Sequence, residues 1–477
     1  MGGKVISTET VRESPVLSPI GAKQQENEDK LLLLEIIINE ELRGVPPQKG
    51  ARTKLQEINY VERRGRAAGA EARRLYISVT ERGTTMWVNS KSLSLGSGSQ
   101  ATIYLGYYFE NLSCDEAVTY WQSCQRDDDE AEFFSPEKLQ EMVVSDQDWI
   151  KMDEECSKVS RIPVAIKAFK DERVGDLESN ILGKSRGEHF LVRFYDKFHF
   201  AGAVYMVQEL GTMSLQDWLD WVKTKPTGER EFDRAILEEK KDIIRALCNA
   251  VKKIHQASGG SIIHRDIRPP NILFDHQGWL KLCDFGLARQ YTSKKLAEQK
   301  MIEQGTILDP KKMGIPVDMQ PYEVVQVFFK VTSSASAGAE TSGSSSDTVY
   351  VPYSHASDIF MLAATIYKVV TDRAPFDYKH MVHDLTDEPL HSNLIPDLKP
   401  IDAFAPNGPL LSHLLSKMLD HDSKKRPSID DVLAHPYFQV GHPYFHSPPF
   451  LVALPLVLTH PNPLPLTTVM GRQHEHR

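Results

Sequence analysis

The sequence predicts an α+β fold in which a β-rich N-terminal part precedes a larger, mainly helical C-terminal part. β-like runs come first, and helical segments with apolar residues at three- and four-residue spacing dominate after residue 213. The expected strands lie within 86–105, 161–170 and 204–208, and the expected helices cover 214–222, 236–255 and 358–370. The length of 477 residues, with 41% hydrophobic and 25% charged residues, indicates one to three globular domains and excludes global disorder.

Charge and cysteine content narrow the class of protein. The net charge of −9 argues against nucleic acid as the main ligand. Five scattered cysteines show neither zinc-ligand spacing nor a disulfide framework, which favours a reducing compartment. No secretory signal opens the sequence, and no apolar stretch approaches the ~20 residues of a membrane helix. We therefore expect an intracellular, cytoplasmic protein without a membrane span, and a nuclear location stays open.

Composition divides the chain into a folded region and less regular segments. Residues 1–85 read as a partly disordered N-terminal extension with one short helix over Leu31–Leu42. Residues 110–160 carry 15 acidic and 4 basic residues and read as an insertion into the domain that spans 86–438. We expect this insertion to loop out and to be dispensable for ligand binding, because long insertions cost little closure entropy. The seven serines of 332–347 indicate a flexible loop, and 439–477 form a Pro-rich tail.

Two patterns before residue 170 can each be interpreted either as purely structural or as part of a binding site. The segment 95–103, Leu-Gly-Ser-Gly-Ser-Gln-Ala-Thr-Ile, is typical of a plain hairpin turn, but its small residues also allow backbone N–H groups to approach a polyphosphate. Lys167 ends the run Val-Ala-Ile-Lys at 164–167. It is either an edge-strand lysine that faces water or a charge that reaches phosphate oxygens.

The block from His264 to Gly286 carries more specific chemistry. His264-Arg265-Asp266 is followed by Asn271 and then by Asp284-Phe285-Gly286. Two carboxylates and a carboxamide suit Mg²⁺, which prefers hard oxygen ligands and keeps substrate phosphates in its shell. One carboxylate is then left to accept a proton. A polar loop with capping aspartates does not explain why these elements occur together.

These motifs together resemble the eukaryotic protein kinase family. The glycine-rich loop, the Val-Ala-Ile-Lys strand, the His-Arg-Asp loop with its asparagine, and Asp-Phe-Gly occur in the family's order over residues 86–438. The resemblance implies a two-lobed kinase fold, with a small β-rich N-lobe that carries one key helix and a larger helical C-lobe. It also implies ATP and Mg²⁺ as cofactors, protein substrates, and transfer of the γ-phosphoryl group to a protein hydroxyl.

The resemblance assigns roles residue by residue. Asp266 would orient the substrate hydroxyl, and Arg268 would lie near the transferred phosphate. Lys167 would hold the α- and β-phosphates and pair with Glu178, while Asn271 and Asp284 would bind Mg²⁺. The residues expected around the nucleotide are Gly96, Ser97, Gly98, Ser99, Ile103, Ala165, Lys167, Glu178, Gln208, Glu209 and Leu210. Asp358 resembles the buried aspartate of the large lobe, and Arg426 resembles the arginine that pairs with the end of the activation segment, here Glu323.

Departures from the family pattern qualify the details. Ala101 replaces the third loop glycine, the acidic insertion separates the loop from Lys167, and only eleven residues separate Lys167 from Glu178. The activation segment lacks a clean Ala-Pro-Glu end. Arg265 implies activation by loop phosphorylation, which leaves room for an upstream activating kinase. The candidate phosphorylation sites are Tyr291, Thr292, Ser293 and Thr306.

The acceptor specificity rests on two segments that disagree. Asp266-Ile267-Arg268-Pro269 resembles the serine/threonine branch, whereas Ile315-Pro316-Val317 resembles the tyrosine-kinase pattern. The catalytic loop touches the transferred phosphate, so we expect a serine/threonine kinase. A tyrosine or dual-specificity kinase is the alternative. A pseudokinase scaffold is less favoured because no chemical residue is missing. A small-molecule kinase is less favoured because Phe285, Gly286 and Arg426 are present.

Overall fold

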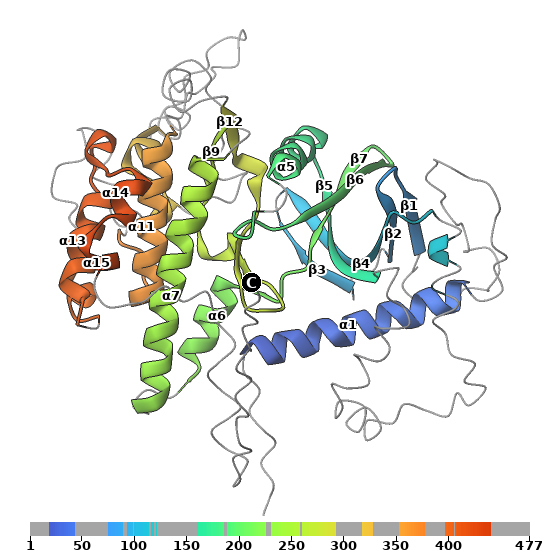
Figure 1. The fold of residues 1–477 in the computed structure, drawn as a ribbon, viewed down its shortest axis with the longest axis horizontal. Coiled ribbons are helices and arrows are strands. Elements are labelled where there is room, and N and C mark those ends of the chain that lie inside the picture. Colours follow the sequence, from blue (N-terminus) through green and yellow to red (C-terminus); the bar gives the residue numbers. More distant parts are fainter. Residues whose placement is uncertain are drawn as a thin grey trace, which may run out of the picture.

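The structure is a computed structural model. It describes most of the residues that the sequence places in helices and strands. It describes residues 19–42, 75–88, 93–98, 100–113, 116–118, 121, 161–185, 188–225, 230–257, 260–291, 317–327, 353–376, 396–404 and 406–439. Figure 1 shows the sheet at one end of these residues and most of the helices at the other. The Ser-rich loop 332–347 and the tail from residue 440 onward lie outside the described residues.

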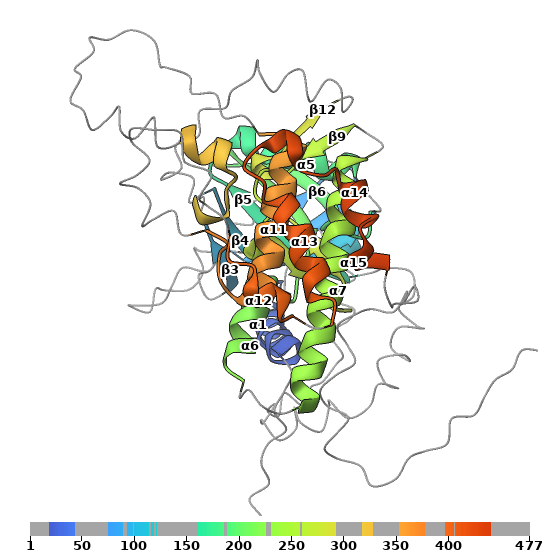
Figure 2. The ribbon, with the colours of Figure 1, turned by 90° about the vertical axis from the view of Figure 1, so that its left-hand side faces the viewer.

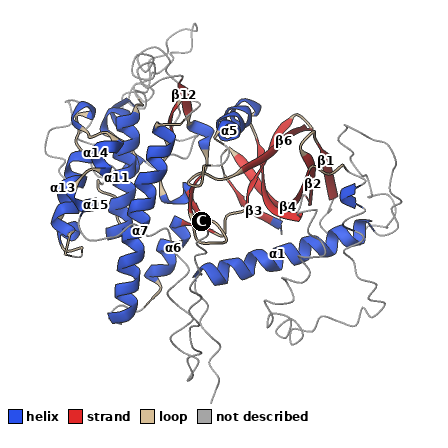
Figure 3. Cartoon of the chain, viewed as in Figure 1, coloured by secondary structure: helices blue, strands red, loops and turns tan. Residues whose placement is uncertain are grey.

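The helices and strands follow the predicted order of a β-rich part and then a helical part (Figure 3). In chain order the elements are α1 (Pro19–Leu42), β1 (Leu75–Val79), β2 (Gly83–Val88), β3 (Ser94–Ser97), β4 (Ala101–Glu110), β5 (Arg161–Phe169), α5 (Glu172–Lys184), β6 (Phe194–Phe200), β7 (Ala203–Glu209), β8 (Met213–Ser214), α6 (Leu215–Lys223), α7 (Arg230–His255), β9 (Ser261–Ile263), β10 (Ile272–Phe274), β11 (Leu280–Leu282), β12 (Arg289–Tyr291), α11 (His355–Thr371), α12 (Lys399–Asp402), α13 (Gly408–Met418), α14 (Ile429–Leu433) and α15 (Pro436–Gln439). The strands expected within 86–105, 161–170 and 204–208 and the helices expected over 214–222, 236–255 and 358–370 are all present, whereas the helix expected over Leu31–Leu42 is longer than predicted.

The small lobe is built on one antiparallel sheet with the strand order β1-β2-β4-β5-β7-β6, and β3 also pairs with β4. Its curl encloses an aromatic cluster in which the rings of Tyr76 and Trp87 stack with centroids 5.2 Å apart, and Phe198 stacks on Tyr205 at the same separation. Helix α5 packs against this sheet. Gly175 makes the close approach, because a Cβ there would come within 2.8 Å of Phe169 and Val204.

The large lobe is centred on α11, which is buried along most of its length. Figure 2 shows α11 among α7, α13 and α12, and these helices contact it. Its N-terminus is set by a capping box, in which the Ser354 hydroxyl accepts from the Ser357 N–H and Ser357 returns the bond. The strongly apolar pattern of this segment predicted the helix, and burial of its whole circumference explains that pattern.

The N-terminal boundary differs from the prediction. The sheet begins at Leu75, not at Met86, because β1 pairs with β2 over the full register from Leu75↔Val88 to Val79↔Thr84. Helix α1 begins at Pro19 and is twice as long as the helix expected over Leu31–Leu42. Residues 19–42 and 75–85 of the predicted extension are therefore part of the small lobe. Residues 1–18 and 43–74 lie outside the described residues.

Helix α1 connects the two lobes. Figure 1 shows it running beneath the sheet from β1 and β2 toward α6. Leu34, Ile38 and Leu42 are almost fully buried against the strands, while Asn27 Nδ2 donates to the carbonyl oxygen of Thr212 at 3.4 Å, just after the strand β7 that leaves the small lobe. The helix thus spans the junction between the lobes from one side.

The start of the acidic insertion is also part of the fold, which corrects the expectation that 110–160 loops out entirely. Trp121 is 3% exposed, and its Nε1 donates to Asn39 Oδ1 of α1 at 2.5 Å. Its ring meets Tyr107 edge-on at 5.3 Å, and Ala117 is fully buried nearby. The beginning of the insertion therefore contributes Ala117 and Trp121 to the core of the small lobe. Residues 122–160 lie outside the described residues.

The burial of α1 yields a stability prediction. Leu34→Ala should lower the free energy of unfolding by about 2–5 kcal/mol, because it leaves a cavity beneath a fully buried side chain. Leu32→Ala is the matched control, since Leu32 on the same helix is 40% exposed and should change stability by less than about 0.5 kcal/mol. Denaturant titration measures both. Equal small effects would show that α1 is not packed on the sheet in solution.

Candidate active site

The glycine-rich segment forms a hairpin turn between β3 and β4. The Gly98 N–H donates to the Ala101 carbonyl at 2.8 Å, and the Ser97 and Thr102 hydroxyls lie 3.1 Å apart. Lys170, just after β5, holds the turn from below through Nζ to the Gly98 carbonyl at 2.8 Å. Gly96 and Ser97 are exposed, as the predicted nucleotide contacts require, whereas Ser99 lies outside the described residues.

Lys167 and Glu178 form the predicted ion pair. Lys167 Nζ lies 2.8 Å from Glu178 Oε2, and the two side chains are 7% and 0% exposed. The eleven-residue separation suffices because α5 starts directly after β5, with Asp171 as its N-cap. Burial alone would lower the pKa of Lys167, but Glu178 and Asp284 outweigh burial and raise it, so the amine stays charged. Burial raises the pKa of Glu178, and Lys167 opposes that rise.

The His264–Asp266 loop is anchored on Asp358 of α11. The carboxylate of Asp358 accepts from the backbone N–H of His264 at 2.8 Å and of Arg265 at 2.9 Å, and it lies 3.0 Å from His255 Nε2. Arg265 has a φ of 71°, a left-handed conformation that costs a non-glycine residue free energy. Asp358 thus holds a strained turn next to Asp266.

Asp266, Arg268 and Asn271 converge at the end of that turn. Arg268 Nε donates to Asp266 Oδ1 at 2.9 Å, and Asn271 Nδ2 donates to Asp266 Oδ2 at 2.6 Å. Burial raises the pKa of Asp266, although Arg268 opposes the rise. A carboxylate that is oriented from two sides and has a raised pKa is suited to accept a proton.

Asp284 faces Lys167 from the large lobe. Its Oδ1 lies 2.8 Å from Lys167 Nζ, and its side chain is 35% exposed. The left-handed φ of 63° at Asp284 turns the chain so that Phe285 is fully buried, with its ring edge-on to His264 at 4.7 Å. Burial alone would raise the pKa of Asp284, but Lys167 lowers it, so the group is a carboxylate at neutral pH.

The expected nucleotide wall is formed by neighbouring strands. Ile103 pairs with Lys167 across β4 and β5, and Ala165 pairs with Gln208 across β5 and β7. Gln208 is 5% exposed, and its Oε1 has no hydrogen-bond partner among the described residues. The Glu209 side chain accepts a hydrogen bond from the Arg193 N–H at 3.0 Å. Leu210 packs against the hydrophobic cluster that contains Leu34 and Ile38 of α1. The structure brings these residues to the junction of the lobes.

The end of the activation segment is tied to the large lobe by the predicted pair. Arg426 binds Glu323 through two hydrogen bonds of 2.8 Å, and its side chain is fully buried. Arg426 Nε also donates to the Asp420 carbonyl at 2.7 Å. The segment has no clean Ala-Pro-Glu end in the sequence, yet Glu323 is the residue at which Arg426 binds it.

Of the four candidate phosphorylation sites, Tyr291 is the one that the structure describes. Its hydroxyl lies 3.4 Å from Arg265 Nη2, and the Arg265 guanidinium lies 5.3 Å from the centre of the Tyr353 ring. Thr292, Ser293 and Thr306 lie outside the described residues.

Two residues near the site were missed by sequence reasoning. Tyr353 is 1% exposed and covers Arg265, but no motif surrounds it. Gln100 lies at the tip of the glycine-rich turn, and its Oε1 is 2.4 Å from where a Cβ on Gly286 would lie. A side chain at Gly286 would therefore displace the Gln100 amide from this position. The sequence gives no signal for either contact.

Asp358 allows a prediction about stability and pH. Burial alone would raise its pKa, but the hydrogen bonds from His255 and Arg265 lower it below the ordinary value of 3.8. The stabilisation is therefore fully present above pH 3.8 and is lost as the pH falls through the lowered pKa. Asp358→Asn should cost about 1.5–3 kcal/mol at pH 7. Urea titrations of wild type and variant should converge at low pH, and an unchanged midpoint at pH 7 would contradict the assigned bonds.

The residues around Asp284 fit a magnesium ion chemically. The amide nitrogen of Asn271 is committed to Asp266, which leaves its amide oxygen as the available ligand. Asp284 offers a charged, partly exposed carboxylate on the facing segment. Both are hard oxygen donors of the kind that Mg²⁺ prefers together with phosphate oxygens.

Comparison with known proteins agrees with this geometry. Residues 154–307 match the family model of the protein kinase domain. The chain is similar to "Dual specificity protein kinase TTK" of Mus musculus, with 27% identity over 53% of this chain and 25% of the relative. It is also similar to "Dual specificity protein kinase Ttk" of Danio rerio, with 26% identity over 52% and 21%, and to "Serine/threonine-protein kinase par-4" of Caenorhabditis briggsae, with 25% identity over 51% and 30%.

The fold is the two-lobed α+β fold of a kinase domain, and the family model places that domain at residues 154–307. The chain carries a protein kinase domain, so the resemblance found in the sequence is confirmed. The chain spans about a quarter of the length of these relatives. Among the described residues, no helix has the length and apolar character needed to cross a membrane.

Proposed function

We propose that the chain is an ATP- and Mg²⁺-dependent protein kinase that phosphorylates serine and threonine hydroxyls, and that it acts inside the cell. The observation that carries the proposal is the convergence of two groups at the lobe junction. Lys167 contacts both Glu178 and Asp284 at 2.8 Å, and Asp266 is oriented by Arg268 and Asn271. A scaffold without turnover would not need Asp266 to be oriented by Arg268 and Asn271.

In this mechanism the protein contributes positioning and electrostatics. The charged Lys167 would bind the α- and β-phosphates while Glu178 fixes its position. Asp266 would orient the acceptor hydroxyl and take its proton, and Arg268 would neutralise charge on the transferred phosphoryl group. Asn271 and Asp284 would hold Mg²⁺, which supplies Lewis-acid stabilisation of the phosphate oxygens.

The catalytic loop supports serine and threonine as acceptors. Arg268, two residues after Asp266, is bound to it at 2.9 Å and lies close enough to steady a phosphoryl group that a short hydroxyl side chain attacks. The relatives named dual-specificity kinases keep phosphorylation of tyrosine as the second candidate.

The test is incubation of the purified protein with labelled ATP and Mg²⁺, followed by phosphoamino-acid analysis of a basic protein substrate and of the enzyme. We expect phosphoserine and phosphothreonine. Phosphotyrosine alone would overturn the acceptor assignment. No incorporation by the wild-type protein, with retained nucleotide binding, would instead support a scaffold.

A further inference from the structure

Three metal-ligating side chains meet on the surface of the small lobe, and none of them is assigned to catalysis or to the nucleotide. Glu172 and Asp176 belong to α5, and His199 belongs to the neighbouring strand β6. Among the residues that the structure describes, they are the one group of three or more histidine, cysteine or acidic side chains whose ligand atoms all lie within 4.8 Å of one another. We call this group the α5–β6 cluster.

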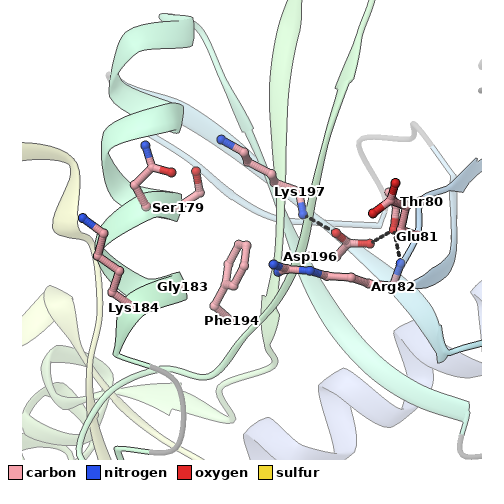
Figure 4. Close-up of a pocket in the computed structure, with 10 residues that line it drawn as sticks. Thr80, Glu81, Arg82, Ser179, Gly183, Lys184, Phe194, Asp196 and Lys197 are labelled. Carbon is pink, nitrogen blue, oxygen red and sulfur yellow. Dashed lines mark hydrogen bonds between the residues drawn. The ribbon is translucent and has the colours of Figure 1, made fainter. Parts of the chain in front are cut away.

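The spacing of the residues along the chain explains why the cluster forms. Residues four apart on a helix lie on the same face, so Glu172 and Asp176 present their carboxylates together. Alternate residues of a strand point to the same side of the sheet, so His199 points the same way as Lys197. Figure 4 shows the Lys197 side chain extending from its strand toward α5, and its Nζ lies 2.8 Å from Asp176 Oδ1. The pleat of β6 therefore directs the His199 ring at the same helix.

The distances within the cluster are close to those of a metal site. His199 Nε2 lies 3.3 Å from Glu172 Oε1 and 3.9 Å from Asp176 Oδ1. With bonds of about 2.0–2.2 Å, two ligand atoms of a tetrahedral zinc ion stand about 3.3–3.5 Å apart. The Glu172–His199 pair already has this separation. A small rotation of the Asp176 side chain brings the third ligand atom to the same distance.

The cluster is accessible, and its charge favours a cation. The side chains of Glu172, Asp176 and His199 are 58%, 41% and 52% exposed, so an ion can reach them from solution and water can complete its coordination. Lys197 neutralises one of the two carboxylates and leaves the other beside the imidazole. Imidazole nitrogen together with carboxylate oxygen is a ligand set typical of Zn²⁺, whereas Mg²⁺ prefers oxygen ligands alone.

The geometry points to the α5–β6 cluster as a binding site for a divalent transition-metal cation, with Glu172, Asp176 and His199 as its protein ligands. The bound ion joins the first turn of α5 to the end of β6, and water occupies the remaining coordination position. The competing explanation of the 3.3 Å contact is an ion pair between His199 and Glu172, which predicts no response to zinc. The site does not depend on the proposed kinase activity.

The experiment measures modification of individual histidines of the full chain by diethyl pyrocarbonate, read by peptide mass spectrometry at increasing Zn²⁺ concentration. The reagent attacks imidazole that is not bound to a metal, so coordination at Nε2 protects His199. We expect Zn²⁺ to slow modification of His199 at least tenfold, whereas His276, an exposed histidine of the large lobe, stays reactive. Because each histidine is followed separately, zinc bound elsewhere on the chain does not affect the result.

Substitutions of nearly equal size identify the other ligands. Glu172→Gln and Asp176→Asn should each raise the zinc concentration for half-protection of His199 at least tenfold, because an uncharged amide oxygen is a weaker ligand than a carboxylate. Glu110→Gln is the matched control, since it removes an exposed carboxylate of the small lobe outside the cluster, and it should leave that concentration unchanged. Lys197→Met should lower it at least twofold, because the lysine competes with the ion for Asp176.

Absence of zinc protection at wild-type His199 would overturn the site, and so would protection that survives both Glu172→Gln and Asp176→Asn. Equal protection by Mg²⁺ would overturn the assignment to a transition metal. An unchanged or higher half-protection concentration in Lys197→Met would place the ion away from Asp176 and overturn the three-ligand arrangement. All measurements are made without nucleotide, so a failure of the proposed kinase activity leaves them interpretable.

Discussion

Asp266→Asn should reduce phosphoryl transfer by about 10²–10⁴-fold while nucleotide binding stays close to that of the wild type. The amide cannot accept the hydroxyl proton. Nucleotide binding should be spared, because Asp266 is bound by Arg268 and Asn271 and is not one of the residues expected around the nucleotide. Turnover is measured with labelled ATP, and nucleotide affinity by thermal shift. Near wild-type turnover would show that Asp266 is not the proton acceptor.

Asp284→Asn should act differently, and the comparison of the two variants is the informative result. It removes the charge that would hold Mg²⁺ and that lies 2.8 Å from Lys167 Nζ, so Mg²⁺-dependent nucleotide affinity should fall at least about tenfold together with turnover. An exposed carboxylate of the large lobe, Asp402, supplies the control as Asp402→Asn, which should change neither property. Identical effects of Asp266→Asn and Asp284→Asn would contradict the separate roles.

The second large effect is expected at the pair that closes the activation segment. Arg426→Ala should destabilise the large lobe by about 3–5 kcal/mol, because it leaves the Glu323 carboxylate without its cation and removes the guanidinium donor from the carbonyl oxygens of Ala356, Asp420 and His421. Denaturant unfolding of the wild type and the variant measures this loss in the free energy of unfolding.

A double-mutant cycle separates the pair from its surroundings. Glu323→Ala and the double variant should give a coupling free energy of about 1–3 kcal/mol with Arg426→Ala, because the two side chains share two hydrogen bonds. Arg426→Lys tests geometry, since lysine keeps the charge but cannot make both bonds. Strict additivity of the two alanine substitutions would contradict the pair.

The candidate site was largely predictable because its chemistry is written in short contiguous motifs. Lys167, Asp266, Asn271 and Asp284 each stand at a fixed spacing from a recognisable run, and the structure places their side chains at the lobe junction. Glu178 was predictable from a carboxylate on the next helix. Their roles toward ATP and Mg²⁺ remain predictions that the substitutions above test.

The rest of the fold could not be predicted because it depends on contacts between distant segments. Strand β1 pairs with β2 along its whole length, and Trp121 is buried because it packs against Tyr107 of β4 and donates a hydrogen bond to Asn39 of α1, 82 residues earlier. In the sequence, Trp121 stands beside a strongly acidic run, and this run suggested an exposed insertion. Local composition therefore assigned the segment to solvent, and tertiary packing decided otherwise.

The position of α1 has a consequence for how the protein is made. Its apolar face is synthesised first, but the tryptophan that covers it comes about 80 residues after Leu42 and the hinge contact at Thr212 later still. At ribosomal rates of 5–20 residues per second, Trp121 is made roughly 4–17 s after Leu34 and Ile38. Until β1, β2 and β4 have been made, the nascent chain presents the aliphatic side chains of this helix to chaperones and to other nascent chains. The packing of the small lobe around α1 is therefore complete only after Trp121 has been made.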